Sequence, residues 1–230
     1  MSEYVFRNDL NVFQPKEETP NFGYSDGDAA EDYLLNSVLK TDDLRLSSRA
    51  LSRYAIDWPS LYHFSPLRAN LLRPFESFLK GKRVLEIGSG CGAITRYLGE
   101  ICASVTALEG SLRRARITAA RCRDLDNVLV FCDNAENFNN NELYDVVTLI
   151  GVLEYSRVFI SGENPPLAML QLAHSLLKPD GILVIAIENR FGLKYLAGAP
   201  EDHLGVPYSG INDHYQQITA VTFCRRQLDR

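Results

Sequence analysis

Apolar residues follow two spacings along this chain, and the change between them at residues 83–101 is the clearest feature of the pattern. A short β-branched-rich run without helical spacing predicts a strand: Val84, Leu85 and Ile87. The run after it repeats at the spacing of one helix face: Ile94, Tyr97, Leu98 and Ile101. Three glycines separate the two patterns: Gly88, Gly90 and Gly92. The sequence therefore predicts a strand, a glycine turn and a helix.

The same alternation continues after this unit. Further strands are predicted at residues 104–108, 128–131, 144–150 and 182–187. Helices begin after Ser111 and at Pro165, and Lys178–Gly181 has the residues of a turn. Strands that alternate with helices predict an α/β fold whose mostly parallel sheet has helices on both faces.

The residues before the first of these strands divide into two parts. Residues 1–27 contain prolines and glycines and few periodic apolar positions, so we expect an irregular N-terminal arm. Residues 28–80 read as helical, with helices at 28–40 (capped by Asp28), at 46–56, and from Pro66 onward with Ser65 as its cap. Residues 81–230 then form the main α/β domain.

Composition narrows the class of protein. With 46% hydrophobic and 23% charged residues among 230, the chain is typical of a globular domain with one core. No apolar run is long enough to span a membrane and no signal peptide is visible, so a cytoplasmic location is expected. A net charge of −5 argues against a nucleic-acid partner. The five cysteines have no metal-binding spacing, so no metal site is predicted.

The helix after Ser111 carries five arginines at positions 113, 114, 116, 121 and 123. Because Asp124 and Asp126 lie beside it in the sequence, we interpret these arginines as a solvated face rather than a polyanion site.

The glycine turn is compatible with two classes of cofactor. Gly88-x-Gly90-x-x-Ala93 fits the dinucleotide fingerprint, and Glu109 lies where a ribose-binding acid belongs. A nicotinamide-dependent oxidoreductase is therefore one hypothesis. Three features favour a different class of cofactor: Glu86 at the strand end, the added Gly92, and the Asp133 segment after the third strand.

With these residues the chain resembles the class I S-adenosylmethionine-dependent methyltransferases. Glu86–Gly92 resembles the first motif of that family, Glu109 its ribose-binding acid, and Asp133–Ala135 its adenine-edge segment. The resemblance implies a Rossmann-like sheet and S-adenosylmethionine as the cofactor. The cofactor-binding positions it implies are Tyr62, Glu86, Gly88, Ser89, Gly90, Glu109, Gly110, Asp133, Asn134, Ala135 and Gly151.

Some of these positions also have a structural interpretation. Glu86 either orders the glycine turn and the cofactor ammonium through a water or is a buried structural carboxylate. By the same resemblance residues 28–80 are an N-terminal helical lid over the cofactor, with Tyr62–Phe64 as its candidate contact. Aromatic packing within a small helical subdomain is the alternative.

A finer resemblance comes from residues 188–213, together with 62–65 and 68–73. These segments resemble methyltransferase domains attached to bacterial surface-polysaccharide glycosyltransferases. This implies O-methylation of a sugar, in a small-molecule or glycan acceptor. The first candidate for the general base is His203, which follows the fifth strand with Glu201 and Asp202 close enough in sequence to orient it. Glu188 is the second candidate, and a purely structural role for His203 stays open.

Another alternative to an active enzyme is a degenerate methyltransferase domain that binds a partner or cofactor without turnover. The C-terminal residues raise a separate expectation. A class I sheet normally ends with two more strands, whereas 217–227 reads as a helix. We therefore expect a domain that is truncated at its C-terminus, followed by further domains such as a glycosyltransferase. The open edge of the fifth strand would be shielded by residues 190–213 or used in a homodimer.

Overall fold

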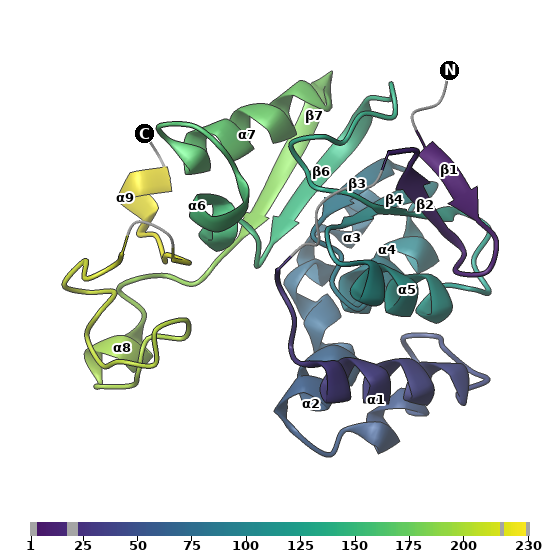
Figure 1. Cartoon of the computed structure of the whole chain (residues 1–230), viewed down its shortest axis with the longest axis horizontal. Helices are drawn as coiled ribbons and strands as arrows, with labels where there is room; N and C mark the ends of the chain where they lie inside the picture. The colour runs from purple at the N-terminus through teal and green to yellow at the C-terminus, as the bar shows by residue number, and fades with distance from the viewer. Residues whose placement is uncertain (1–3, 18–22, 217–218, 229–230) are drawn as a thin grey trace. The chain divides into compact units, whose positions relative to one another are not determined.

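The computed structural model describes residues 4–17, 23–216 and 219–228. It contains a seven-stranded sheet in the order β1-β2-β5-β4-β3-β6-β7, with helices around it (Figure 1). The strands are β1 (Tyr4–Arg7), β2 (Val12–Pro15), β3 (Arg83–Ile87), β4 (Ser104–Glu109), β5 (Val128–Cys132), β6 (Tyr144–Ile150) and β7 (Leu177–Ala186). Strand β3 pairs in parallel with β4, β4 with β5, and β5 with β2, whereas β1 pairs antiparallel with β2. The predicted α/β class with a mostly parallel sheet is confirmed.

The helices of the described residues differ widely in length. The α-helices are α1 (Asp28–Leu39), α2 (Trp58–Phe64), α3 (Glu76–Leu79), α4 (Ala93–Ile101), α5 (Leu112–Arg121), α6 (Ser156–Phe159), α7 (Pro165–Ser175), α8 (Leu193–Leu196) and α9 (Arg225–Leu228). The 3₁₀ turns are η1 (Leu51–Tyr54), η2 (Pro66–Leu71), η3 (Arg73–Phe75) and η4 (Leu153–Tyr155). None of the described helices has the length and apolar character needed to cross a membrane.

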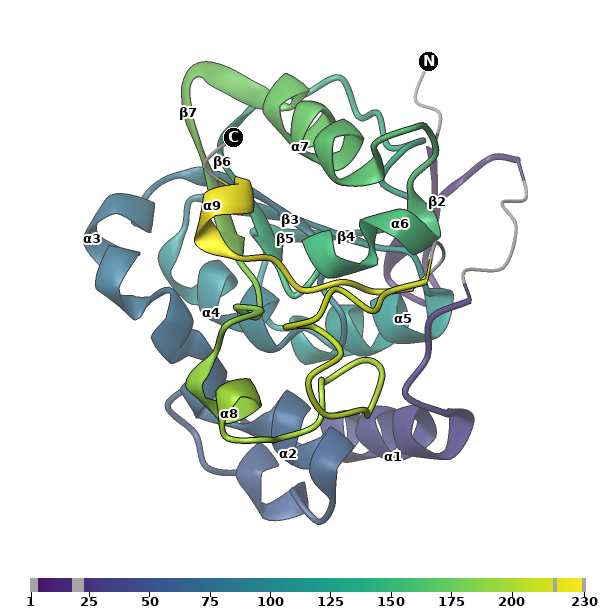
Figure 2. The ribbon, with the colours of Figure 1, turned by 90° about the vertical axis from the view of Figure 1, so that its left-hand side faces the viewer.

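The chain forms two compact units. The first contains Met1–Thr148 and Leu176–Ile182, and the second contains Leu149–Ser175 and Leu183–Arg230. In the first unit, α4 and α5 lie side by side on one face of β3, β4 and β5 (Figure 2). An apolar cluster joins the sheet to α5: Val12, Ala107, Ala115, Ala119, Val130 and Cys132. A second cluster joins α1 and α2 to α5, so the helical residues before β3 are part of this unit.

The N-terminal arm is not irregular where the structure describes it. Residues 4–15 form a β-hairpin that extends the sheet beyond β5. Val12 is fully buried, and the Phe13 ring stacks on Phe131 at 4.7 Å. The sequence did not show this hairpin because each strand has only four residues, too few for a period, and its partner β5 lies far along the chain.

Four local predictions were also wrong. Residues 46–56 contain only the 3₁₀ turn η1, and the segment after Ser65 is 3₁₀ rather than α-helical. Lys178–Gly181 lies inside β7, so strand pairing overrode the turn residues. In the expected helix at 217–227, residues 219–224 are not helical, only 225–228 form α9, and 217–218 lie outside the described residues.

Gly92 of the glycine turn can be compared with Gly81, which precedes β3, to separate the effect of packing from that of backbone strain. Both glycines have a φ of +75°. A Cβ on Gly92 would lie 3.0 Å from the Thr118 Cα of α5, whereas a Cβ on Gly81 would meet nothing within 4 Å. Gly81→Ala should cost only the left-handed strain, about 1–2 kcal/mol. Gly92→Ala should lose about 1–3 kcal/mol more through overpacking. Equal losses of unfolding free energy in urea titrations would contradict this account.

Candidate functional site

The glycine turn between β3 and α4 is fixed to the end of β4 by its own amides. Gly88, Gly90 and Gly92 all have positive φ, between +57° and +78°. The N–H groups of Gly88 and Ser89 both donate to the Leu108 carbonyl, at 2.8 and 3.0 Å. The Gly90 N–H donates to Glu109 Oε2 at 2.7 Å. The motif residues predicted to act together therefore do meet in the fold.

Glu109 ends β4 and is buried, with 4% of its surface exposed. Its second oxygen accepts the Ser111 N–H at 3.0 Å. Burial raises the pKa of this carboxyl above its usual value, and the charge of Arg114 and the two N–H donors only partly oppose that effect. Each carboxylate oxygen has more than one lone pair, so both can still accept a ligand hydroxyl.

Glu86 lies at the end of β3 and is 3% exposed. Its carboxylate accepts the Thr95 hydroxyl of α4 at 2.6 Å. Burial raises the pKa of Glu86 to about 8, which the Thr95 hydrogen bond only partly opposes. Glu86 thus anchors α4 to β3, in agreement with the structural interpretation, and its contact with a cofactor ammonium stays a prediction.

The Asp133 segment follows β5, where it is contacted by the hairpin. The Tyr4 hydroxyl donates to Asp133 Oδ2 at 2.7 Å, and the Asn134 N–H donates to Asp133 Oδ1 at 2.8 Å. Asp133 and Ala135 are buried, while Asn134 and Gly110 are half-buried. The N-terminal hairpin therefore contributes a side chain to the predicted adenine-edge segment, which the sequence gave no reason to expect.

A cation beside Glu86 was missed at the sequence level. The Arg68 guanidinium of η2 lies 3.9 Å over the ring of Tyr62, and its charge lowers the pKa of Glu86. Arg68 Nε is buried and has no partner among the described residues, and the same is true of Ser89 Oγ. Because buried polar groups are normally paired, these two atoms are available to a ligand at the glycine turn.

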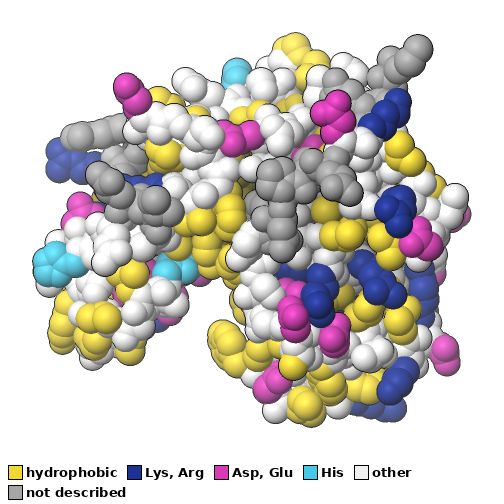
Figure 3. Space-filling model, viewed as in Figure 1, with side chains coloured by type: hydrophobic (Ala, Val, Ile, Leu, Met, Phe, Trp, Pro, Cys, Tyr) yellow, Lys and Arg dark blue, Asp and Glu magenta, His cyan; other side chains and the backbone are white. Residues whose placement is uncertain are grey.

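The arginines of α5 are not all solvated. Arg113 is part of a solvated face, as expected, and it pairs with Asp28 and Asp32. On the face of the molecule seen in Figure 3, basic and acidic side chains are likewise interspersed. Arg114 and Arg121, by contrast, are 7% and 3% exposed. Helical periodicity indicates that adjacent positions of α5 differ in burial. All five arginines were nevertheless assigned to the solvent from the sequence, because charged side chains are usually exposed.

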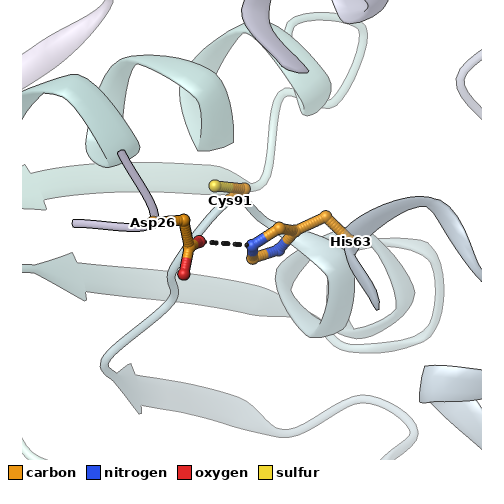
Figure 4. Close-up of side chains that lie close together, drawn as sticks. All are labelled: Asp26, His63 and Cys91. Atoms are coloured by element: carbon orange, nitrogen blue, oxygen red, sulfur yellow. Dashed lines mark hydrogen bonds and ion pairs between the residues drawn. The ribbon is translucent and has the colours of Figure 1, made fainter. Parts of the chain in front are cut away.

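These arginines adjoin a cluster formed by Asp26, His63 and Cys91 (Figure 4). His63 Nε2 lies 2.9 Å from Asp26 Oδ2. Burial lowers the pKa of His63, and the His63 hydrogen bond lowers that of Asp26, so a neutral imidazole donates to an ionised carboxylate. Arg121 Nη1 donates to the His63 carbonyl at 2.6 Å. This cluster joins the N-terminal helices to the glycine turn.

A second polar cluster lies in the second unit, after the carboxyl ends of two strands. Glu154 in η4 follows β6, Glu188 follows β7, and His203 lies in the loop after α8. One ligand atom from each lies within 4.8 Å of the others. Burial, the charge of Glu188 and a side-chain hydrogen bond with Glu188 raise the pKa of Glu154. The two predicted catalytic residues are thus neighbours, and Gly151 begins the turn that brings Glu154 to them.

Glu154 was not singled out from the sequence, although its position directly after a buried strand was a usable signal. The expected partners of His203 were also wrong. Glu201 accepts the backbone N–H groups of His203 and Leu204, and Asp202 pairs with Lys194 and Tyr195. The imidazole instead contacts the Tyr155 hydroxyl through Nδ1, at 3.4 Å.

Both the sequence and the structure of this chain are similar to those of known methyltransferases. The chain is 27% identical over 168 residues to the ubiquinone biosynthesis O-methyltransferase of Vibrio cholerae serotype O1, covering 70% of this chain and 65% of that protein. It is 28% identical over 171 residues to the enzyme of the same name from Shewanella halifaxensis, covering 70% and 68%. The chain thus spans about two thirds of the length of these relatives.

Among solved structures, the N-methyltransferase NodS from Bradyrhizobium japonicum WM9 in complex with S-adenosyl-L-homocysteine has a TM-score of 0.47 at 22% identity, covering 71% of this chain and 75% of that one. A DhpI-SAM-HEP complex has a TM-score of 0.46 at 21% identity, covering 79% and 77%. The profile of the family described as "Methyltransferase domain" matches residues 61–227, which is most of the chain. The chain therefore belongs to the methyltransferase-domain family.

Proposed function

We propose that this chain is an S-adenosylmethionine-dependent O-methyltransferase whose acceptor is a sugar hydroxyl. The observation that carries the proposal is the 2.7 Å hydrogen bond from the Gly90 N–H to the Glu109 carboxylate. It joins the glycine turn to the acid that we propose binds the ribose. The family supports methyl transfer, and the similarity to the O-methyltransferase of Vibrio cholerae supports oxygen as the methylated atom. The resemblance of residues 188–213 supports a sugar acceptor and a cytoplasmic role beside a glycosyltransferase in surface-glycan synthesis.

The residues of the first unit fit such a cofactor. Glu109 would accept the ribose hydroxyls, and Asp133 or Asn134 would meet the adenine edge. Arg68 Nε and Ser89 Oγ are buried donors without partners in the described residues, and a zwitterionic methionine group would satisfy both. Tyr62, Gly88, Gly110 and Ala135 would contact the cofactor through their backbone or ring faces.

When bound, S-adenosylmethionine supplies a methyl group that its sulfonium already activates. In the transfer, the acceptor oxygen would form a bond to that methyl carbon as the carbon–sulfur bond broke, and the bonding pair would stay on sulfur. The chain's residues must therefore align the acceptor and remove its proton. His203 is the first candidate for the proton acceptor, because its Nε2 is buried and has no partner in the described residues. Glu188 is the second.

The ribose assignment is tested with Glu109→Gln, which keeps the size of the side chain and one carbonyl oxygen. It removes a charge-assisted acceptor, worth about 1.5–3 kcal/mol. The affinity for S-adenosylmethionine should fall at least about tenfold in calorimetry. Glu163→Gln, at an exposed position, is the control. Unchanged affinity in a folded Glu109→Gln variant would refute the assignment.

Glu86→Gln separates the structural role of this residue from a cofactor role. Because the folded-state pKa of Glu86 is raised from 4.5 to about 8, the folded protein binds more protons than the unfolded chain between these values, and stability falls as pH rises. The unfolding free energy of Glu86→Gln should therefore increase relative to that of the parent as the pH rises across this window, by up to about 1.4 kcal/mol per pH unit. A constant difference from pH 4.5 to 8 would contradict the raised pKa. Weaker binding of S-adenosylmethionine by the variant would support the predicted contact between Glu86 and the cofactor ammonium group.

The base assignment is tested with His203→Ala and a panel of nucleotide-sugar, glycan and phenolic acceptors. Turnover with the methylated acceptor should fall by about 10² to 10⁴, the range for a positioned base, with unchanged cofactor affinity. His174→Ala, on an exposed face of α7, should retain parent activity. Turnover within a few-fold of the parent in His203→Ala would move the role to Glu188, and methylation of phenols alone would exclude the sugar acceptor.

A further inference from the structure

Glu154, Glu188 and His203 come from three separate segments of the second unit, and each presents an atom without a partner in the described part of the chain. These atoms are Glu154 Oε2, Glu188 Oε2 and His203 Nε2. Glu154 is only 2% exposed, so bulk water does not compensate for the missing contact. A buried carboxyl oxygen without a partner is costly, and natural structures rarely retain one that no ligand satisfies.

In the described part of the chain, the two carboxyl groups of the cluster also lack a basic partner. No ion pair joins Glu154 or Glu188 to a lysine or arginine within residues 4–17, 23–216 and 219–228. The Asp26–His63–Cys91 group differs on this point: its carboxylate already accepts from His63 at 2.9 Å and lies 3.5 Å from Arg114 Nη2. That group is internally satisfied and faces a cation, whereas the Glu154 cluster contains two acids and no counter-charge.

We infer that Glu154, Glu188 and His203 bind a divalent metal cation. Two carboxylate oxygens and an imidazole nitrogen are ligands that Mn²⁺, Fe²⁺, Zn²⁺ and Mg²⁺ accept. Ligand atoms around one ion are separated by up to about 4.4 Å, twice a bond of about 2.0–2.2 Å. The 4.8 Å limit of the cluster is therefore within a small side-chain rotation of that geometry.

The surroundings of His203 fit a ligand role. Metal-binding histidines usually donate their second ring N–H to an oxygen, which fixes the ring orientation. Nδ1 of His203 lies 3.4 Å from the Tyr155 hydroxyl, which leaves Nε2 as the atom directed to the cluster. The Tyr155 ring meets the imidazole edge to face at 5.3 Å and further restricts it.

This inference deepens the proposed function and rests on it only for its catalytic consequence. Three protein ligands leave coordination positions for an acceptor oxygen, and a bound divalent cation lowers the pKa of such an oxygen. A bound cation would thereby replace the base role that the proposed function gives to His203: the acceptor proton would pass to water, and His203 would act as a ligand. The cation site itself does not depend on which acceptor is methylated.

The experiment measures binding of Mn²⁺ to the full chain after treatment with EDTA and dialysis. Calorimetry and electron paramagnetic resonance should show one saturable Mn²⁺ site per chain. Glu154→Gln and His203→Ala should each weaken binding by at least about tenfold, as expected for the loss of a ligand. Glu163→Gln, at an exposed acid of the same unit, should bind as the parent does. Circular dichroism confirms folding of each variant.

The absence of saturable Mn²⁺ binding would overturn the inference and favour a proton shared by the two carboxylates. Mn²⁺ binding that Glu154→Gln and His203→Ala leave unchanged would overturn it as well. Failure of the proposed function is separable from either result, because a chain that binds Mn²⁺ as described but methylates no hydroxyl acceptor retains the metal site and loses only the assigned reaction.

Discussion

The buried carboxylate of Glu109 holds together the part of the molecule on which the candidate cofactor site depends. One oxygen accepts the Gly90 N–H and the other the Ser111 N–H, so a single side chain fixes the glycine turn and the start of α5 at the end of β4. Burial alone would favour a neutral carboxyl. The two amides and the Arg114 charge favour its ionised form, which is the form that accepts hydroxyl hydrogen bonds most strongly.

Buried arginines extend this network to the N-terminal helices. Arg121 is buried, which lowers its pKa to about 10, and it donates to the carbonyls of His63 in α2 and Cys91 in the glycine turn. The Thr118 hydroxyl of α5 donates to the Gly90 carbonyl at 2.8 Å. The helices before β3 are therefore attached to the glycine turn by charge-assisted hydrogen bonds as well as by apolar packing. Substitutions in α5 should consequently affect the turn even though α5 is not part of the motif.

The buried acids of the two units differ in which side chains they face. In the first unit, Glu109 and Asp26 face Arg114, and each accepts a hydrogen bond. In the second unit, Glu154 and Glu188 face each other and an imidazole, with a raised pKa for Glu154 as the result. Electrostatics thus assigns different chemistry to Glu109 and to the pair Glu154 and Glu188, although the sequence presents all three in the same way, as single acids at or just after strand ends.

The sequence by itself determined the α/β class and the local order of strand, glycine turn and helix. It could do so because apolar periodicity, glycine conformation and strand-end acids are properties of short segments. Glu86 and Glu109 accordingly lie at the ends of β3 and β4, and the glycines lie between β3 and α4, as the apolar pattern indicates. His203 and Glu188 were also brought together, since both follow the same strand.

Only the tertiary structure decided the features that depend on distant partners. The hairpin at residues 4–15 exists because β5 offers an open edge, and it places Tyr4 on Asp133. Arg114 and Arg121 are buried because α1, α2 and the glycine turn pack over α5, which no charge pattern within α5 records. Glu154 joined the Glu188 and His203 cluster because the ends of β6 and β7 are neighbours in the sheet. Such contacts are set by strand pairing and helix packing between remote segments, and the spacing of residues along one chain does not contain them.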